Sequence, residues 1–108
     1  MKNLFSLALM TTLSVALASV VAADSAKGQG VYMNFCASCH ASGVAGAPKV
    51  GDKDAWQDRI DKGVPAMAAQ AIKGFQGKSG FMPAKGGNSA LTDEEVTSAT
   101  MYMVEQSK

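Results

Sequence analysis

One short motif contains every cysteine and histidine of the chain. Cys36 and Cys39 are the two cysteines, and His40 directly follows the second. Two thiols three residues apart lie on one face of a helical turn. A C-x-x-C-H run has the spacing of c-type haem attachment, in which each thiol bonds one porphyrin vinyl group and the adjacent imidazole reaches the iron. The motif predicts one haem c attached through Cys36 and Cys39, with His40 as an iron ligand.

Three other uses of a cysteine pair suit this chain less well. A structural disulfide within the motif would close a very short loop and remove little entropy from the unfolded chain. A thioredoxin-like dithiol is expected beside a βαβ pattern, and the sequence has no β-rich run to build one. Structural zinc usually takes four ligands, and the sequence offers no further Cys or His.

The first 23 residues have the layout of a signal peptide. Lys2 precedes an uncharged, mostly apolar run over residues 4–23, which ends in the small residues Val21-Ala22-Ala23. We expect cleavage after Ala23 and export to the periplasm, leaving a single domain of residues 24–108 with no permanent membrane anchor. The run is nearly long enough to span a bilayer, so an uncleaved anchor is the alternative.

The charge balance of the mature chain excludes one class of partner. Its 85 residues hold nine basic and nine acidic side chains, so nucleic-acid binding has no electrostatic support. A domain of this size buries a modest fraction of its surface and often relies on a staple such as a metal or a disulfide. A covalently attached haem would be such a staple.

Apolar periodicity and helix-end signals predict about four helices and no β-strand. The end signals are Asp52 as a cap, Pro65 and Gly74 at the two ends of one helix, and the capping box Thr92-Asp93-Glu94-Glu95. The expected helices cover residues 25–39, 52–62, 65–73 and 92–106. The first delivers the cysteines, although Gly28 and Gly30 each weaken it by roughly 1 kcal/mol relative to Ala. Close approach of another backbone would explain that cost. The pattern predicts one small all-α domain.

Three further residues are candidates for the haem surroundings. Pro48 lies in the Gly- and Ala-rich loop after His40, and its carbonyl is a candidate acceptor for the second ring nitrogen of an iron-bound histidine. Trp56, the single tryptophan, is either a core aromatic or a donor to a haem propionate, a role that Arg59 could also fill.

The second axial ligand decides between an electron carrier and an enzyme. With no second histidine, the soft ligands of the mature chain are the methionines at positions 33, 67, 82, 101 and 103. Met82, in a glycine-rich loop, is favoured over Met67, which lies on the apolar side of its helix. A methionine would close the site, whereas an open or weakly held position would suit a haem enzyme or a ligand sensor.

Three motifs in order carry a family resemblance. They are Cys36-Ala37-Ser38-Cys39-His40, Gly51-Asp52-Lys53-Asp54-Ala55-Trp56 and Phe81-Met82-Pro83-Ala84-Lys85-Gly86-Gly87. With them, the mature chain resembles the class I bacterial cytochromes c, and most closely the c5 group. The resemblance implies about four helices wrapped around one haem, and His40 and Met82 as axial ligands. It also implies that Gly28 and Tyr32 cross the last helix near Ala99 and Tyr102.

One departure from the c5 pattern concerns the segment before the last helix. Members of that group often carry an extra cysteine pair there, whereas this chain has Gly87-Asn88-Ser89-Ala90. The subgroup assignment is therefore less specific than the class.

The expected function is one-electron transfer between redox proteins, with no catalytic residue and a monomeric or weakly dimeric protein. Residues 62–91 contain lysines but no Asp or Glu, and Lys73, Lys78 and Lys85 surround the Met82 loop. Such an excess could steer acidic redox partners. The alternative is that these lysines only keep a glycine-rich surface soluble.

Overall fold

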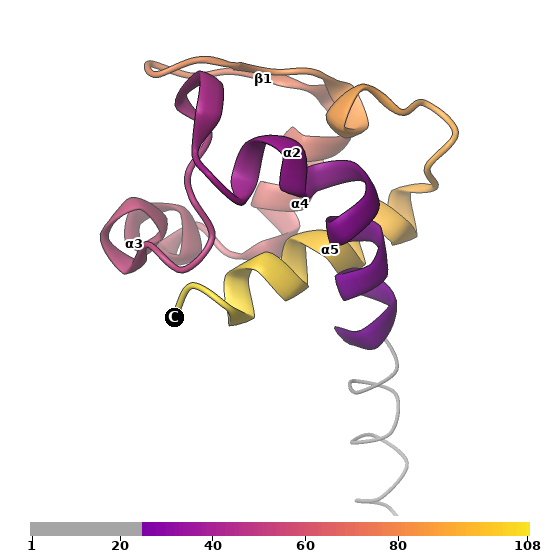
Figure 1. Ribbon diagram of the computed structural model, residues 1–108, viewed down its shortest axis with the longest axis horizontal. Helices are drawn as coiled ribbons and strands as arrows, with labels where there is room; N and C mark the ends of the chain where they lie inside the picture. Colours follow the sequence, from indigo (N-terminus) through magenta and orange to yellow (C-terminus); the bar gives the residue numbers. More distant parts are fainter. Residues whose placement is uncertain (1–24) are drawn as a thin grey trace, which may run out of the picture.

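A computed structural model describes residues 25–108, so the expected signal peptide and its cleavage site lie outside the described residues. Residues 25–31 form an α-helix that continues into a π-helix, η1 (Tyr32–Cys36), and then into α2 (Ala37–His40). The other α-helices are α3 (Lys53–Asp61), α4 (Val64–Lys73) and α5 (Asp93–Glu105). Two 3-10 turns, η2 (Val44–Gly46) and η3 (Ala84–Gly87), lie in the loops (Figure 1). Within residues 25–108, no helix is both long and apolar enough to cross a membrane.

The helix ends confirm the signals in the sequence. The Asp52 side chain accepts a hydrogen bond from the Ala55 amide at 3.2 Å and so caps α3. Pro65 lies in the first turn of α4, and Gly74 ends that helix with a φ of 86°. At α5, the Thr92 hydroxyl and the Glu95 carboxylate each accept the other residue's amide, at 3.1 and 3.0 Å.

This capping box yields a pH-dependent prediction. Hydrogen bonds from Thr92 lower the pKa of the Glu95 carboxyl below its ordinary value, the backbone bond contributing most. The unfolded chain therefore takes up the proton first as the pH falls. The stabilisation is complete above the ordinary glutamate pKa and is lost as the pH falls through the lower, folded-state pKa. Glu95→Gln keeps the bonding pattern without the charge.

We expect wild type to melt above Glu95→Gln at pH 7, and the two melting temperatures to converge as the pH falls below the ordinary glutamate range. Thermal unfolding of both proteins from pH 7 to pH 3 measures this, since every other titrating group is shared. A difference in melting temperature that stays constant over that range would contradict the role of the Glu95 charge.

The expectation of no β-strand was wrong in the glycine-rich segment. β1 (Phe75–Gln76) and β2 (Phe81–Met82) form an antiparallel hairpin in which Phe75 lies opposite Met82. Strands of two residues are too short for an alternating pattern to appear in the sequence. The pairing gives the Met82 backbone a fixed register, and the described fold remains mostly helical.

The first helix crosses α5 at close range. A Cβ on Gly28 would overlap the Ser98 carbonyl of α5. One turn later, the rings of Tyr32 and Tyr102 lie 5.3 Å apart. The crossing implied by the family resemblance is thus confirmed. Gly30 has no atom within 4 Å of an added Cβ, so close approach explains the first glycine and not the second.

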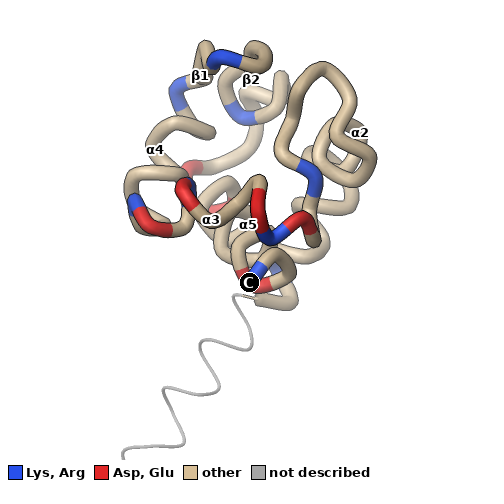
Figure 2. The backbone as a smooth tube through the Cα atoms, turned by 90° about the vertical axis from the view of Figure 1, so that its left-hand side faces the viewer, with Lys and Arg blue, Asp and Glu red and all other residues tan. Residues whose placement is uncertain are grey.

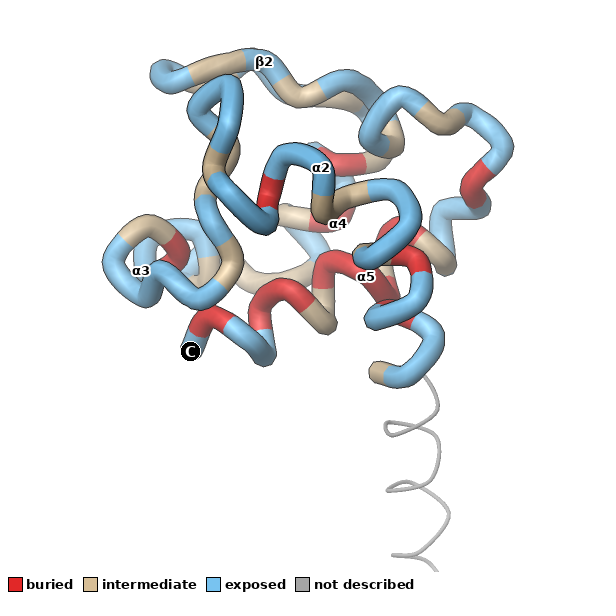
Figure 3. The backbone as a smooth tube through the Cα atoms, viewed as in Figure 1, coloured by how far each residue is buried: buried red, intermediate tan, exposed pale blue. Residues whose placement is uncertain are grey.

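The core divides into two clusters that meet at Cys36, and α5 contributes to both. Buried positions recur along α5 (Figure 3). One cluster consists of Val31, Ala71, Leu91, Val96 and Ala99. The other consists of Trp56, Met103 and Val104. Cys36 packs against both, which places the motif between them.

The π-helix just before the motif was not predicted. In η1, the Ala37 amide bonds to the Tyr32 carbonyl five residues back. One extra residue in a turn rotates everything after it by about 100° relative to a regular helix. Regular α-helical spacing therefore does not run from residues 25–31 through to Cys39 and His40.

Candidate haem site

The His40 side chain is held in place by the loop that follows it in the chain. It ends α2, is 9% exposed, and its Nδ1 lies 2.9 Å from the Pro48 carbonyl oxygen. When Nδ1 carries the proton and donates to Pro48, Nε2 keeps the lone pair that a metal requires. The Val50 amide also donates to the His40 carbonyl at 2.8 Å, which ties the loop to the motif.

The two cysteines differ in their surroundings. Cys36 is half-buried and Cys39 is exposed, and no disulfide joins them. Burial raises the pKa of the Cys36 thiol to about 11, so this thiol is neutral at physiological pH. A thiol–disulfide oxidoreductase needs a thiol with a lowered pKa. The electrostatics of Cys36 therefore do not favour the dithiol alternative.

A cavity of about 500 Å³ contains the whole set of residues that the sequence singled out. The seven are Cys36, Cys39, His40, Pro48, Trp56, Arg59 and Met82, and all line it. They come from η1, α2, the loop after it, α3 and the hairpin (Figure 1). Two thiols, an imidazole and a thioether around one largely apolar cavity form a donor set that fits a covalently attached haem.

The positions of the methionines relative to the cavity narrow the choice of a second iron ligand. Met33 is 65% exposed and Met101 lies elsewhere, whereas Met67, Met82 and Met103 line the cavity. Met67 and Met103 pack in the Trp56 cluster, and the rings of Trp56 and His40 lie 6.1 Å apart. Met82 packs against the other cluster. Of these three methionines, Met82 is therefore the one outside the Trp56 cluster, whose tryptophan ring lies beside His40.

Trp56 and Arg59 differ in whether they have an N–H group free to donate to a haem propionate. Trp56 is 3% exposed, and its indole N–H donates to the Lys49 carbonyl at 2.8 Å. That donor is therefore engaged, and Trp56 acts as a packing residue beside His40. Arg59 is exposed at the cavity and donates to the Ala55 carbonyl of its own helix. Its guanidinium has further N–H groups to offer.

The rim of the cavity includes residues that the sequence did not assign to it. Of the exposed large hydrophobic side chains among residues 25–108, all but Met33 line it: Phe35, Val44, Phe75 and Phe81. Phe75 and Phe81 carried a signal, because large apolar side chains in a glycine-rich loop usually pack against something. Val44 carried none. Its turn, η2, meets the hairpin turn, since an added Cβ on Gly46 or Gly80 would overlap a carbonyl of the other turn.

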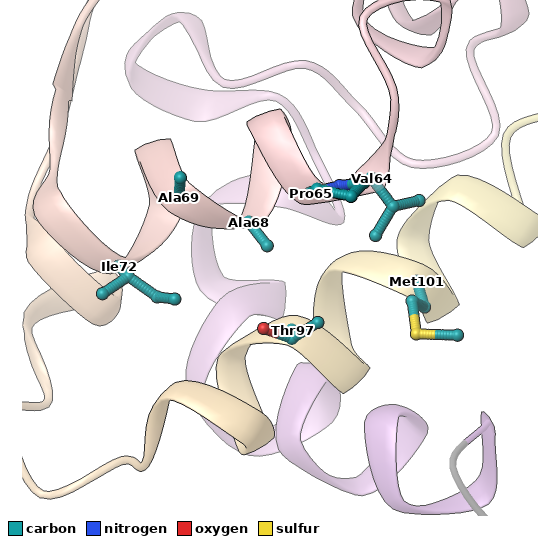
Figure 4. A pocket seen from close by; sticks show the side chains of 7 residues that line it. All are labelled: Val64, Pro65, Ala68, Ala69, Ile72, Thr97 and Met101. Carbon is teal, nitrogen blue, oxygen red and sulfur yellow. The ribbon is translucent and has the colours of Figure 1, made fainter.

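A second hollow, of about 560 Å³, lies between α4 and α5 (Figure 4). Its lining residues are Val64, Pro65, Ala68, Ala69, Ile72, Thr97 and Met101. The set contains no cysteine or histidine and does not fit haem attachment.

Comparison with known proteins assigns the chain to a family. A family model described as cytochrome C oxidase, cbb3-type, subunit III matches residues 23–103. The chain is 46% identical to cytochrome c-555 of Chlorobaculum tepidum over 108 residues, which cover both chains completely. It is 37% identical to cytochrome c5 of Ectopseudomonas mendocina over 75 residues, covering 68% of this chain and 82% of that one. The chain is a class I cytochrome c near the c5 group.

A solved structure agrees with this assignment. A chain in a crystal structure described as an electron transfer complex of nitrite reductase with cytochrome c superimposes with a TM-score of 0.68 and 38% identity. The match covers 76% of this cytochrome and 95% of that chain. Membership of the family implies covalently attached haem c, and the Cys36 and Cys39 spacing fits it.

Proposed function

We propose that this cytochrome carries single electrons between redox proteins of the periplasm, with His40 and Met82 as the axial ligands of its haem. When bound, haem c supplies a one-electron ferric–ferrous couple. The observation that carries the proposal is the shared cavity. His40, oriented by Pro48, and Met82, held in β2, line it together with both attachment cysteines.

The protein's own residues would tune and protect the couple. The Pro48 carbonyl fixes the imidazole and raises its basicity as a ligand. A methionine paired with histidine raises the reduction potential. The two apolar clusters, one of which contains Trp56, would limit rearrangement of the ligands. No residue needs to act as an acid, a base or a nucleophile.

The competing function is a haem enzyme or ligand sensor with an open sixth position. Carbon monoxide added to the untreated ferrous protein distinguishes the two, because a bound Met82 would have to leave before the gas could bind. We expect no binding within the mixing time at neutral pH. Rapid and complete binding would favour the enzyme or sensor.

Partners would dock beside the cavity, at the hairpin that carries Met82. The hairpin end of the molecule carries basic residues, and acidic residues gather on α3 and α5 (Figure 2). Lys73 and Lys78 are exposed and form no ion pair within residues 25–108. Lys85 is not part of the proposed docking set, because its side chain is 20% exposed and paired with Asp93. A redox protein with an acidic surface fits this end.

Charge reversal at the rim tests the docking surface. With an acidic redox partner at low ionic strength, Lys78→Glu is expected to slow bimolecular electron transfer several-fold, because steering is lost. Lys53→Glu, the same change on α3, serves as the control. Stopped-flow rates at increasing salt should converge for all three proteins. Salt-independent wild-type rates would contradict steering.

Export to the periplasm rests on the sequence of residues 1–23. N-terminal sequencing of the protein recovered from a periplasmic extract should begin at Asp24. A membrane-bound protein that keeps Met1 would support the anchor instead.

A further inference from the structure

Lys85 makes contacts that neither docking nor haem attachment requires. Its Nζ donates to the Leu91 carbonyl at 2.7 Å and lies 3.0 Å from an Asp93 carboxylate oxygen. The Lys85 side chain is 20% exposed, although lysine usually extends into water. Both partners lie at the start of α5. A single side chain thus ties the loop after Met82 to the terminal helix.

The backbone at this position disfavours lysine. Lys85 has a φ of 55°, in the left-handed region where a residue with a Cβ is disfavoured and glycine is favoured. The residues that follow, Gly86 and Gly87, also have positive φ. A third glycine at position 85 would relieve the backbone. The two contacts of the lysine side chain offset this cost.

Three contacts confine the loop of residues 82–87, which contains Met82. Only one of the three is made by a side chain to the start of α5. An added Cβ on Gly86 would lie 2.9 Å from the Phe35 carbonyl of η1. One on Gly74, at the end of α4, would lie 3.0 Å from the Ala84 amide nitrogen. The third contact is the Lys85 clamp. Leu91, whose carbonyl the clamp holds, belongs to the cluster against which Met82 packs.

We propose that Lys85 is a positioning residue that keeps Met82 at the haem iron by clamping its loop to the start of α5. The inference rests on the proposed ligation by Met82. Without the clamp, the Met82 thioether could still bind the iron, but its loop would move away from the iron more often. The proposed role is therefore in the lifetime of the axial bond rather than in its identity.

Imidazole binding to the ferric holoprotein measures that lifetime, because imidazole can take the sixth position only after Met82 has left. At saturating imidazole, we expect Lys85→Gln to bind about tenfold faster than wild type, which corresponds to about 1.4 kcal/mol. Lys53→Gln removes the same charge from an exposed side chain on α3, away from the cavity, and should stay within about twofold, as for a surface change. Lys85→Gly relieves the backbone but lacks the clamp, so it should also bind faster.

A stability control separates positioning from general loosening of the fold. Asp52→Ala removes the cap of α3, away from the loop, and lowers the melting temperature without touching the clamp. It should leave the imidazole rate near the wild-type value. Amide hydrogen exchange in residues 82–87 should rise in Lys85→Gln and not in Asp52→Ala.

Two outcomes would overturn the proposal while Met82 ligation stands. Either Lys85→Gln and Lys85→Gly bind imidazole at the wild-type rate, or Asp52→Ala accelerates binding as much as they do. Failure of the ligation itself looks different. The wild-type ferric protein would then lack the methionine-to-iron charge-transfer band, and its imidazole rate would rise with concentration without saturating; the role of Lys85 would be wrong as well.

Discussion

Replacing Met82 by alanine is expected to abolish the methionine-to-iron charge-transfer band and to lower the reduction potential by on the order of 100 mV or more. In the proposed site the thioether is the soft ligand that favours the ferrous state, and in the variant water or a weaker donor would take its place. Attachment through Cys36 and Cys39 should be unchanged, so the haem content remains a check on folding. Absorption spectra and a redox titration of the purified variant measure both effects.

Two other methionines serve as controls for this substitution. Met67 lines the same cavity but packs in the Trp56 cluster, and Met33 is 65% exposed. Met67→Leu and Met33→Leu should both keep the band and change the potential by much less than Met82→Ala. If the band survived in Met82→Ala and vanished in Met67→Leu, the ligand would be Met67.

Gly28→Ala is expected to destabilise the protein by about 3 kcal/mol or more, at the upper end of overpacking substitutions. The added methyl group would overlap the Ser98 carbonyl, and backbone at a helix crossing cannot move aside as a flexible side chain can. For a domain of this size, such a loss lowers the melting temperature by more than about 10 °C. Thermal unfolding of the holoprotein measures the shift.

Gly30→Ala, two residues along the same helix, should have the opposite effect. Gly30 is exposed, and no atom lies within 4 Å of its added Cβ. Alanine there should stabilise the protein by about 1 kcal/mol through helix propensity alone. Equal changes in melting temperature for the two variants would contradict the crossing with α5, because the same mutation in the same helix differs only in what the methyl group meets.

The features that sequence predicted well are local. The Asp52 cap, the Thr92 capping box and the glycine that ends α4 depend on residues a few positions apart, and each is present in the structure. The C-x-x-C-H motif is local too. The sequence alone did not explain Gly28. Its explanation is the close approach of Ser98 in α5, seventy residues later in the chain.

The features that sequence missed depend on contacts between distant segments. The hairpin at Phe75 and Phe81 has strands too short for periodicity to show, and the π-helix that ends at Cys36 departs from α-helical spacing without a sequence signal. In the sequence, Lys85 cannot be told apart from a docking lysine. In the structure its backbone has a positive φ, and its side chain contacts Leu91 and Asp93. A pattern of charge along the chain does not show which charges are paired.

The most direct test of the central claim, a closed His40 and Met82 haem site, is an optical redox titration of the wild-type protein. We expect one reversible one-electron transition between low-spin ferric and ferrous spectra, with the methionine charge-transfer band present in the oxidised protein and lost on reduction. A high-spin spectrum without that band would contradict a closed site, whatever the midpoint potential.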